Sequence, residues 1–437
     1  MKMYTQQGTT TERLLLYNMQ QLSRGKKCFT FQKDLPSRAC MSSSSVRASS
    51  DVDVAARPPR SSFASRRQRR RRVVASSSSK SSNSLLLRGK KTTAAMRFSG
   101  RAAALATPDD DDDDDVLLPY EKCSRLLLST ASSPTRGGVA MPRHPTQNVR
   151  DVVAIALEED VADVGDVSSL STIPEDARAT ATLLAKADGI LAGERVANEV
   201  LSMVDGDIEA CWLKRDGDDI EKGEIFCYMR GSARGILRAE RVVLNFMQRM
   251  SGIATLTKKM SERAKPARIL ETRKTAPGLR VIDKWAVLIG GGENHRMGLF
   301  DMVMIKDNHV AAARGIKNAL ESSTKFLIEG GEKYTGVMIE LETRTMEEVK
   351  EVCGLLEDAD TDTSRVQRVM LDNMSMEDMR EAAGMLNRLG VETEASGNVT
   401  LDTIGGIGAT GVTFISSGQL THSVVALDIS LNIENNE

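Results

Sequence analysis

The chain has 437 residues, enough for two or three domains, and a near-neutral formal charge of −1. That balance hides an uneven distribution, because residues 1–149 contain 26 Lys and Arg against 12 Asp and Glu, whereas the remainder is acidic. No apolar run reaches the roughly 18 residues that a membrane-spanning helix requires. The cysteines form no C-x-x-C pair and lack zinc-site spacing, so we expect them to be reduced and structural. They are Cys28, Cys40, Cys123, Cys211, Cys227 and Cys353.

Residues 1–144 show no sustained apolar periodicity. They contain serine runs, the basic stretch Arg66–Arg72 and seven consecutive aspartates, Asp109–Asp115. Such a composition buries too little apolar surface to offset the entropy lost on ordering, so we expect a disordered segment. The part before the aspartates is rich in Ser and Arg and nearly free of acids, which is typical of an organellar transit peptide. We expect import into a plastid, with the mitochondrion as the alternative.

Two other interpretations of this segment stay open. It could be a merely disordered tail, or a start codon placed too far upstream, because Met41 and Met96 are also plausible starts. A nucleic-acid contact through Arg66–Arg72 is weakly supported, since one arginine run without aromatic residues or a folded platform is a poor signal. We therefore expect neither a nucleic-acid nor a membrane partner.

Ordered structure is expected from about residue 145. Residues 148–161 have apolar side chains at helical spacing, residues 176–191 alternate like a strand, and residues 208–229 predict a strand, a turn and a second strand. Residues 235–264 predict one long helix. These segments form a first folded region, with predicted bounds 145–253.

From about residue 268 the pattern changes to short apolar runs, each ending in polar residues and followed by a helical segment. At least six such units occur, which indicates βαβ connections, a parallel sheet and a barrel or near-barrel over residues 254–423. Catalytic groups in such folds lie at the carboxyl ends of the strands. The residues at those predicted ends are Arg273, Lys274, Lys306, Glu342, Asp372, Ser396, Gly397 and Ser416–Gly418.

These strand ends combine cations, acids and small polar residues. Arg pairs with planar carboxylates or phosphates, and Lys acts as a point charge on phosphate. Glu342 and Asp372 could hold one or two Mg²⁺ ions, while the Ser and Gly residues could bind a terminal phosphate through backbone N–H groups. Together they predict a polyphosphorylated sugar and a second anion as substrates. Taken alone, each cation could be a solvated charge, and His295 is more often a structural histidine.

The runs that carry these residues resemble quinolinate phosphoribosyltransferase, also called nicotinate-nucleotide pyrophosphorylase (carboxylating). The matching motifs are "ETRKTAPGLR", "DKWAVLIGGGENHRMGLFDMVMIKDNH", "IELET", "VMLDNMS", "EASGN" and "FISSGQLTHS", in this order. The resemblance covers residues 146–433. It implies an N-terminal α/β sandwich domain, joined by residues 424–437, and a C-terminal incomplete α/β barrel.

The resemblance also implies the reaction and the residues that perform it. Quinolinate and phosphoribosyl pyrophosphate would react with Mg²⁺ to give nicotinate mononucleotide, pyrophosphate and CO₂. Arg241 would reach the site from a neighbouring subunit of a homodimer or larger assembly. By motif match, quinolinate would be held by Arg273, His295, Arg296 and Lys306, the pyrophosphate and metal by Lys274, Glu342 and Asp372, and phosphate by Ser396, Gly397, Asn398, Gly418 and His422.

One departure concerns the stretch between Glu342 and Asp372, which looks longer than usual. If it is a surface insertion, both acids stay in register. If it is not, Glu340 is the alternative metal ligand, and period-two alternation places Glu340 and Glu342 on the same face, so spacing cannot choose between them. The role of His309 also stays open. A phosphoribosyltransferase for nicotinate is the nearest rival, but its single carboxylate would leave the site over-supplied with cations.

Overall fold

The computed structural model describes residues 120–124 and 138–434. Most of the predicted disordered and targeting segment therefore lies outside the described residues, including Asp109–Asp115 and Arg66–Arg72. Residues 120–124 are helical and residues 138–144 are described, although both fall within the segment predicted to be disordered.

A disulfide joins Cys123 to Cys211, which corrects the expectation that all six cysteines are reduced. The helical residues 120–124 lie against the first sheet, where the Tyr120 hydroxyl donates to Glu209 and the Arg230 guanidinium lies over the Tyr120 ring. No sequence signal indicated this pairing, because 88 positions separate the two cysteines. Cys227 and Cys353 are free and buried.

The first folded region is built on a four-stranded antiparallel sheet. Its strands are β3 (Glu209–Trp212), β5 (Ile225–Ser232), β1 (Arg178–Ala185) and β12 (Ile429–Glu434), in the order β12-β1-β5-β3. β12 comes from the end of the chain and pairs with β1, so the C-terminal segment completes this sheet. A separate two-stranded ribbon pairs β2 (Gly189–Ile190) with β4 (Asp219–Ile220).

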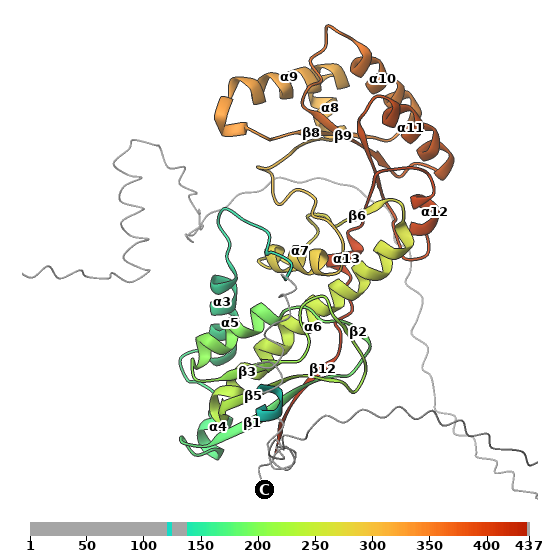
Figure 1. Ribbon diagram of the computed structural model, residues 1–437. Coiled ribbons are helices and arrows are strands. Elements are labelled where there is room, and N and C mark those ends of the chain that lie inside the picture. The colour runs from blue at the N-terminus through green and yellow to red at the C-terminus, as the bar shows by residue number, and fades with distance from the viewer. Residues whose placement is uncertain (1–119, 125–137, 435–437) are drawn as a thin grey trace, which may run out of the picture. The chain divides into compact units, whose positions relative to one another are not determined.

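Four helices of the described residues 138–434 accompany this sheet, and the apolar spacing predicted two of them, over residues 148–161 and 235–264. α3 (Val149–Val161) begins after Asn148, whose side chain accepts the Asp151 backbone N–H, and α4 (Val167–Thr172) and α5 (Glu194–Val204) follow. α5 packs against α6 (Ala233–Ala264), the predicted long helix. α6 contacts strands of the first sheet along one part of its length and β6, α7 and α12 along another (Figure 1).

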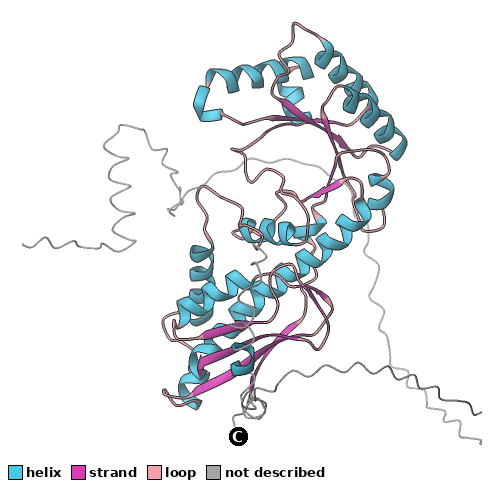
Figure 2. Cartoon of the chain, in the orientation of Figure 1, coloured by secondary structure: helices cyan, strands magenta, loops and turns pink. Residues whose placement is uncertain are grey.

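The second sheet has six parallel strands in the order β6-β11-β10-β9-β8-β7. β6 and β7 are the two edges and do not pair with each other, so the described strands form an incomplete barrel. Figure 2 shows helices along the outside of these strands. The strands are β6 (Arg268–Leu270), β7 (Val303–Ile305), β8 (Ile339–Thr343), β9 (Val366–Asp372), β10 (Glu392–Ser396) and β11 (Phe414–Ser416).

The connections of this barrel are α7 (Arg280–Ile289), α8 (Asp307–Ala313), α9 (Ile316–Glu329), η1 (Gly331–Tyr334), α10 (Met346–Glu357), α11 (Met376–Arg388), α12 (Ile404–Gly408) and α13 (Gln419–His422). The predicted fold class, an α/β sandwich followed by an incomplete α/β barrel, is confirmed. The exact domain boundaries stay a prediction. Among the described helices, none combines the length and hydropathy needed to cross a membrane.

A buried ion pair ties three helices together. Asp283 on α7 is fully buried and accepts two hydrogen bonds from Arg249 on α6, at 2.7 and 2.8 Å. Arg249 also donates to the Thr421 carbonyl on α13, and the Ala276 N–H donates to Asp283. The same pair therefore holds α13 and the loop that follows β6.

Replacing Asp283 with Ala should lower the free energy of unfolding by about 3–5 kcal/mol, because it leaves the Arg249 charge without its buried partner. Denaturant unfolding followed by circular dichroism would measure the loss. The control is Glu199→Ala, which breaks the exposed pair with Arg150 and should cost less than about 1 kcal/mol. Equal effects of the two substitutions would contradict the special role of the buried pair.

Candidate active site

A hollow of about 280 Å³ lies at the carboxyl ends of the barrel strands. Its wall gathers side chains from the ends of all six strands and from the loop after α7. All five residues predicted as catalytic line it, namely Arg273, Lys274, His295, Arg296 and Lys306. Glu342, Asp372 and Ser396 line it as well. The parallel strands thus bring these residues together at one face of the barrel, as expected.

A second hollow, of about 310 Å³, adjoins the first and shares Thr272, Lys274, Ser396 and Ser416 with it. The residues predicted for phosphate line this second hollow, namely Ser396, Gly397, Asn398, Gly418 and His422. The site thus has a cationic compartment and a compartment rich in hydroxyls and glycines, with Lys274 in both.

Two glycines of the second hollow are required by geometry. A Cβ at Gly418 would lie 2.8 Å from the Lys274 side chain and 2.9 Å from the His422 ring. Gly397 has φ of +96°, and a Cβ there would lie 2.1 Å from the Asn373 amide oxygen. At both positions a side chain would clash with neighbouring residues of the site, so glycine is required there.

The cations of the first hollow differ in their partners. Arg273 is half-buried, its Nε is buried without a hydrogen-bond partner, and the guanidinium makes no ion pair with a described residue. The Lys274 ammonium likewise has no such pair among residues 120–124 and 138–434. Burial and the neighbouring charge of Arg273 lower the pKa of Arg296. Two guanidinium groups held near each other, one of them unpaired, favour an anionic ligand.

Arg344, which the sequence analysis did not single out, contacts three acids at the rim. Its guanidinium lies 2.6 Å from Asp307, 3.3 Å from Glu342 and 3.5 Å from Asp372. The Lys306 ammonium is ion-paired to the other oxygen of Glu342. Glu342 and Asp372 therefore line the hollow while ion-paired to the chain's own cations. Arg344 follows Glu342 by two residues, so strand alternation could have indicated it.

The position of Glu340 differs from that of Glu342. Glu340 is fully buried and faces His295, whereas Glu342 lines the hollow beside Lys306 and Asp372. The long connection before β9, residues 358–365, joins the opposite end of that strand, so it does not displace Asp372. The structure thus separates two acids that alternation alone could not.

Arg241 lies outside both hollows. It is on α6, its side chain is 58% exposed, and its ion-pair partner is the neighbouring Glu240 at 3.9 Å. His309 is at the start of α8, where its Nδ1 accepts the Lys306 backbone N–H at 3.0 Å. A helix-capping role explains His309 without any contact to a ligand.

The loop that carries His295 and Arg296 is fastened by a buried pair, Lys284 on α7 and Glu271 after β6, both fully buried. Glu271 accepts the His295 N–H at 3.0 Å, and the Lys284 ammonium donates to the His295 carbonyl at 3.0 Å. Residues 290–297 follow the end of α7 and form no helix or strand, apart from a single bridge at Glu293. Side chains therefore determine where the loop lies.

Comparison with known proteins gives a consistent result. The model of the quinolinate phosphoribosyl transferase C-terminal domain matches residues 253–432, and that of the N-terminal domain matches residues 166–251. A chloroplastic nicotinate-nucleotide pyrophosphorylase [carboxylating] of Oryza sativa is 52% identical over 72% of this chain and 86% of its own length. A mitochondrial quinolinate phosphoribosyltransferase [decarboxylating] 2 of Nicotiana glauca is 54% identical over 68% and 85%.

Solved structures agree. The nicotinate-nucleotide pyrophosphorylase from Francisella tularensis superposes with a TM-score of 0.60 at 35% identity, covering 67% of this chain and 99% of that one. The C-terminal domain model covers the barrel and its strand-end site, and the N-terminal domain model covers the folded region before it. The chain therefore belongs to the quinolinate phosphoribosyltransferase family.

Proposed function

We propose that this chain transfers the phosphoribosyl group of phosphoribosyl pyrophosphate to quinolinate, with decarboxylation, and so makes nicotinate mononucleotide, pyrophosphate and CO₂ for NAD biosynthesis. Family membership supports the reaction. The structural observation that supports the reaction for this chain is the positive charge of Arg273 and Lys274. Both line the hollow and have no ion-pair partner among the described residues. Quinolinate has two carboxylates and the sugar has a phosphate and a pyrophosphate, so both substrates supply the missing anions.

The two compartments suggest how the substrates are divided. Arg273, Arg296 and Lys306 would hold the carboxylates of quinolinate, because Arg forms two parallel hydrogen bonds to a carboxylate. His295 was predicted for the same role, but it lies buried among acids. The second hollow would hold the 5-phosphate through Ser396, Gly397, Asn398, Gly418 and His422. Lys274 lies in both hollows and would hold the pyrophosphate.

Mg²⁺ fits the acids at the rim. Glu342, Asp372 and Asp307 converge on the one guanidinium of Arg344, and carboxylate oxygens are ligands that Mg²⁺ prefers. Glu342 and Asp372 would hold the ion, rather than Glu340, which is buried beneath the hollow beside His295. A bound Mg²⁺ would neutralise charge on the pyrophosphate leaving group.

The chain's own residues would act mainly by positioning and electrostatics. Arg273 and Arg296 would orient the pyridine ring so that its nitrogen faces C1 of the ribose, and Lys274 would stabilise the negative charge that develops on pyrophosphate. After the new C–N bond forms, the carboxylate on the adjacent ring carbon departs as CO₂, its electron pair stays on that carbon, stabilised by the neighbouring cationic nitrogen, and a proton from water then takes its place. No covalent intermediate with the protein is needed.

We also propose a homodimer or larger assembly in which Arg241 of one subunit enters the site of another. The exposed position of Arg241, outside its own subunit's hollows, supports this arrangement. For location we propose the plastid, with the mitochondrion as the alternative, since the plant relatives include both kinds and the front of the chain is rich in Ser and Arg. Residues 1–144 fused to a fluorescent protein would show which organelle imports them.

Arg296→Ala should lower kcat/KM for quinolinate by about two orders of magnitude or more, because it removes a charged partner of a substrate carboxylate. Release of ¹⁴CO₂ from carboxyl-labelled quinolinate measures it. Arg380→Ala, on the exposed side of α11, is the control and should match the parent enzyme. Turnover of nicotinate in place of quinolinate, or a fully active Arg296→Ala enzyme, would overturn the assignment.

Mixing two inactive variants tests the shared site. Arg241→Ala and Lys274→Ala subunits, unfolded and refolded together, should regain about a quarter of parent activity, because half of randomly formed dimers then carry one intact site. Each variant refolded alone should stay inactive. If Arg241 acts within its own subunit, the mixture regains nothing, since every site then lacks one of the two residues.

Asp372→Asn and Glu342→Gln should each weaken Mg²⁺ binding in the presence of phosphoribosyl pyrophosphate by about tenfold or more. Isothermal titration calorimetry measures the affinity directly. Asp360→Asn, in the connection at the opposite end of β9, is the control. Unchanged Mg²⁺ affinity in both acid variants would remove these residues from the metal site.

A further inference from the structure

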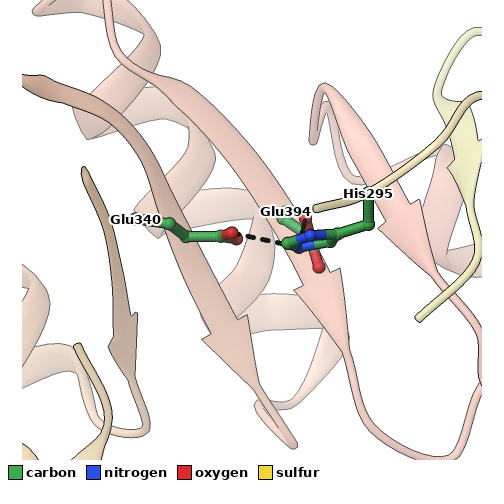
Figure 3. A group of neighbouring side chains, drawn as sticks. All are labelled: His295, Glu340 and Glu394. Carbon is green, nitrogen blue, oxygen red and sulfur yellow. Dashed lines mark ion pairs between the residues drawn. The ribbon is translucent and has the colours of Figure 1, made fainter. Parts of the chain in front are cut away.

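A layer of charged side chains is buried beneath the first hollow. Glu340 on β8, Arg368 on β9 and Glu394 on β10 are each less than 7% exposed. The Arg368 guanidinium donates to Glu394 at 2.8 Å. The ring of His295 lies against this layer, with its Nε2 3.0 Å from Glu340 and 3.3 Å from Glu394 (Figure 3).

Every polar atom of His295 faces the chain itself. Its backbone N–H donates to Glu271 and its carbonyl accepts from Lys284. Its Nδ1 accepts the backbone N–H of Arg296 at 2.6 Å, and its buried Nε2 faces two carboxylates without forming a hydrogen bond. A substrate carboxylate that approached Nε2 would meet like charge.

The protonation of the ring follows from these contacts. Burial lowers the pKa of His295, but Glu394 and Glu340 raise it to about 10, which favours a second ring proton. That proton would have to sit on Nδ1, where the Arg296 N–H points. A donor 2.6 Å from Nδ1 leaves no space for it, so we assign the ring as neutral, with its one proton on Nε2. The other charged groups that face His295 are Glu271, Lys284, Arg296 and, behind Glu394, Arg368.

We propose that His295 is a positioning residue that does not bind quinolinate. Its ring is held in place by the buried Glu340 and Glu394, and it fixes the backbone of Arg296 in turn. This inference rests on the proposed function of Arg296. The acids hold the ring on its Nε2 edge, the ring holds the Arg296 N–H on its Nδ1 edge, and the guanidinium is thereby placed in the hollow. A small displacement of such a binding group is enough to lose much of the rate.

Four variants separate positioning from direct binding. His295→Gln keeps a neutral N–H donor toward the acids, and His295→Ala removes it. Glu394→Gln weakens the support without touching the hollow's cations. Glu392→Gln is the matched control, because Glu392 lies on the same strand and pairs with Arg368 and Arg268 but not with His295. Circular dichroism establishes that each variant folds, and Glu340→Gln replaces Glu394→Gln if the latter does not.

For a positioning role, KM for quinolinate rises about tenfold or more in His295→Ala and Glu394→Gln, less in His295→Gln, and stays within about twofold in Glu392→Gln. Direct binding by a charged imidazolium instead makes His295→Gln as impaired as His295→Ala and leaves Glu394→Gln close to the parent. That pattern would overturn the proposal.

Two measurements do not depend on activity. The chain has only four histidines, so ¹⁵N-histidine spectra of the parent and His295→Gln assign the His295 signal. We expect one protonated and one unprotonated ring nitrogen at neutral pH. The Arg296 amide should exchange with solvent faster in His295→Ala. An imidazolium signal with unchanged Arg296 exchange contradicts the proposal, whereas a parent enzyme that releases no CO₂ from quinolinate contradicts the proposed function alone.

Discussion

A lysine and a glutamate with no access to solvent, Lys284 and Glu271, hold the part of the site that has no regular structure. The pair lies between α7 and the residues after β6, and it binds both polar backbone groups of His295. Removing either partner would leave a buried charge uncompensated, which costs far more than a surface charge. Glu271 also precedes Arg273 by two residues, so one buried pair sets the place of the cations on both sides of the hollow.

The charges of the site fall into three groups with different consequences. Beneath the hollow, Arg368 is paired with Glu394, and both are buried together with Glu340. These charges support the loop that carries His295 and Arg296. At the rim, Arg344 and Lys306 are ion-paired to Glu342 and Asp372, the two acids that we propose as ligands of Mg²⁺. Facing the hollow, Arg273 and Lys274 have no ion-pair partner among the described residues. Their positive charge is therefore uncompensated, and an anionic substrate is attracted most strongly there.

Much of the fold could be predicted because its signals are local. The long helix α6 has apolar residues at helical spacing, and each barrel strand is a short apolar run followed by a helical segment. The clustering of Arg273, Lys306, Glu342 and Asp372 could also be predicted, because parallel strands end at the same edge of a sheet. The Cys123–Cys211 disulfide could not, since residues 120–124 lie far in sequence from the strand they contact.

The sequence by itself determined which residues meet at the strand ends, since strand periodicity and the parallel order leave few alternatives. It could not tell Glu340 from Glu342, which share one face of β8, nor reveal that the Nε2 of His295 faces two buried acids. Those distinctions depend on depth within the barrel and on what the neighbouring strands place opposite each side chain. Depth and cross-strand neighbours are properties of the packed sheet, because they arise only when segments distant in sequence come into contact.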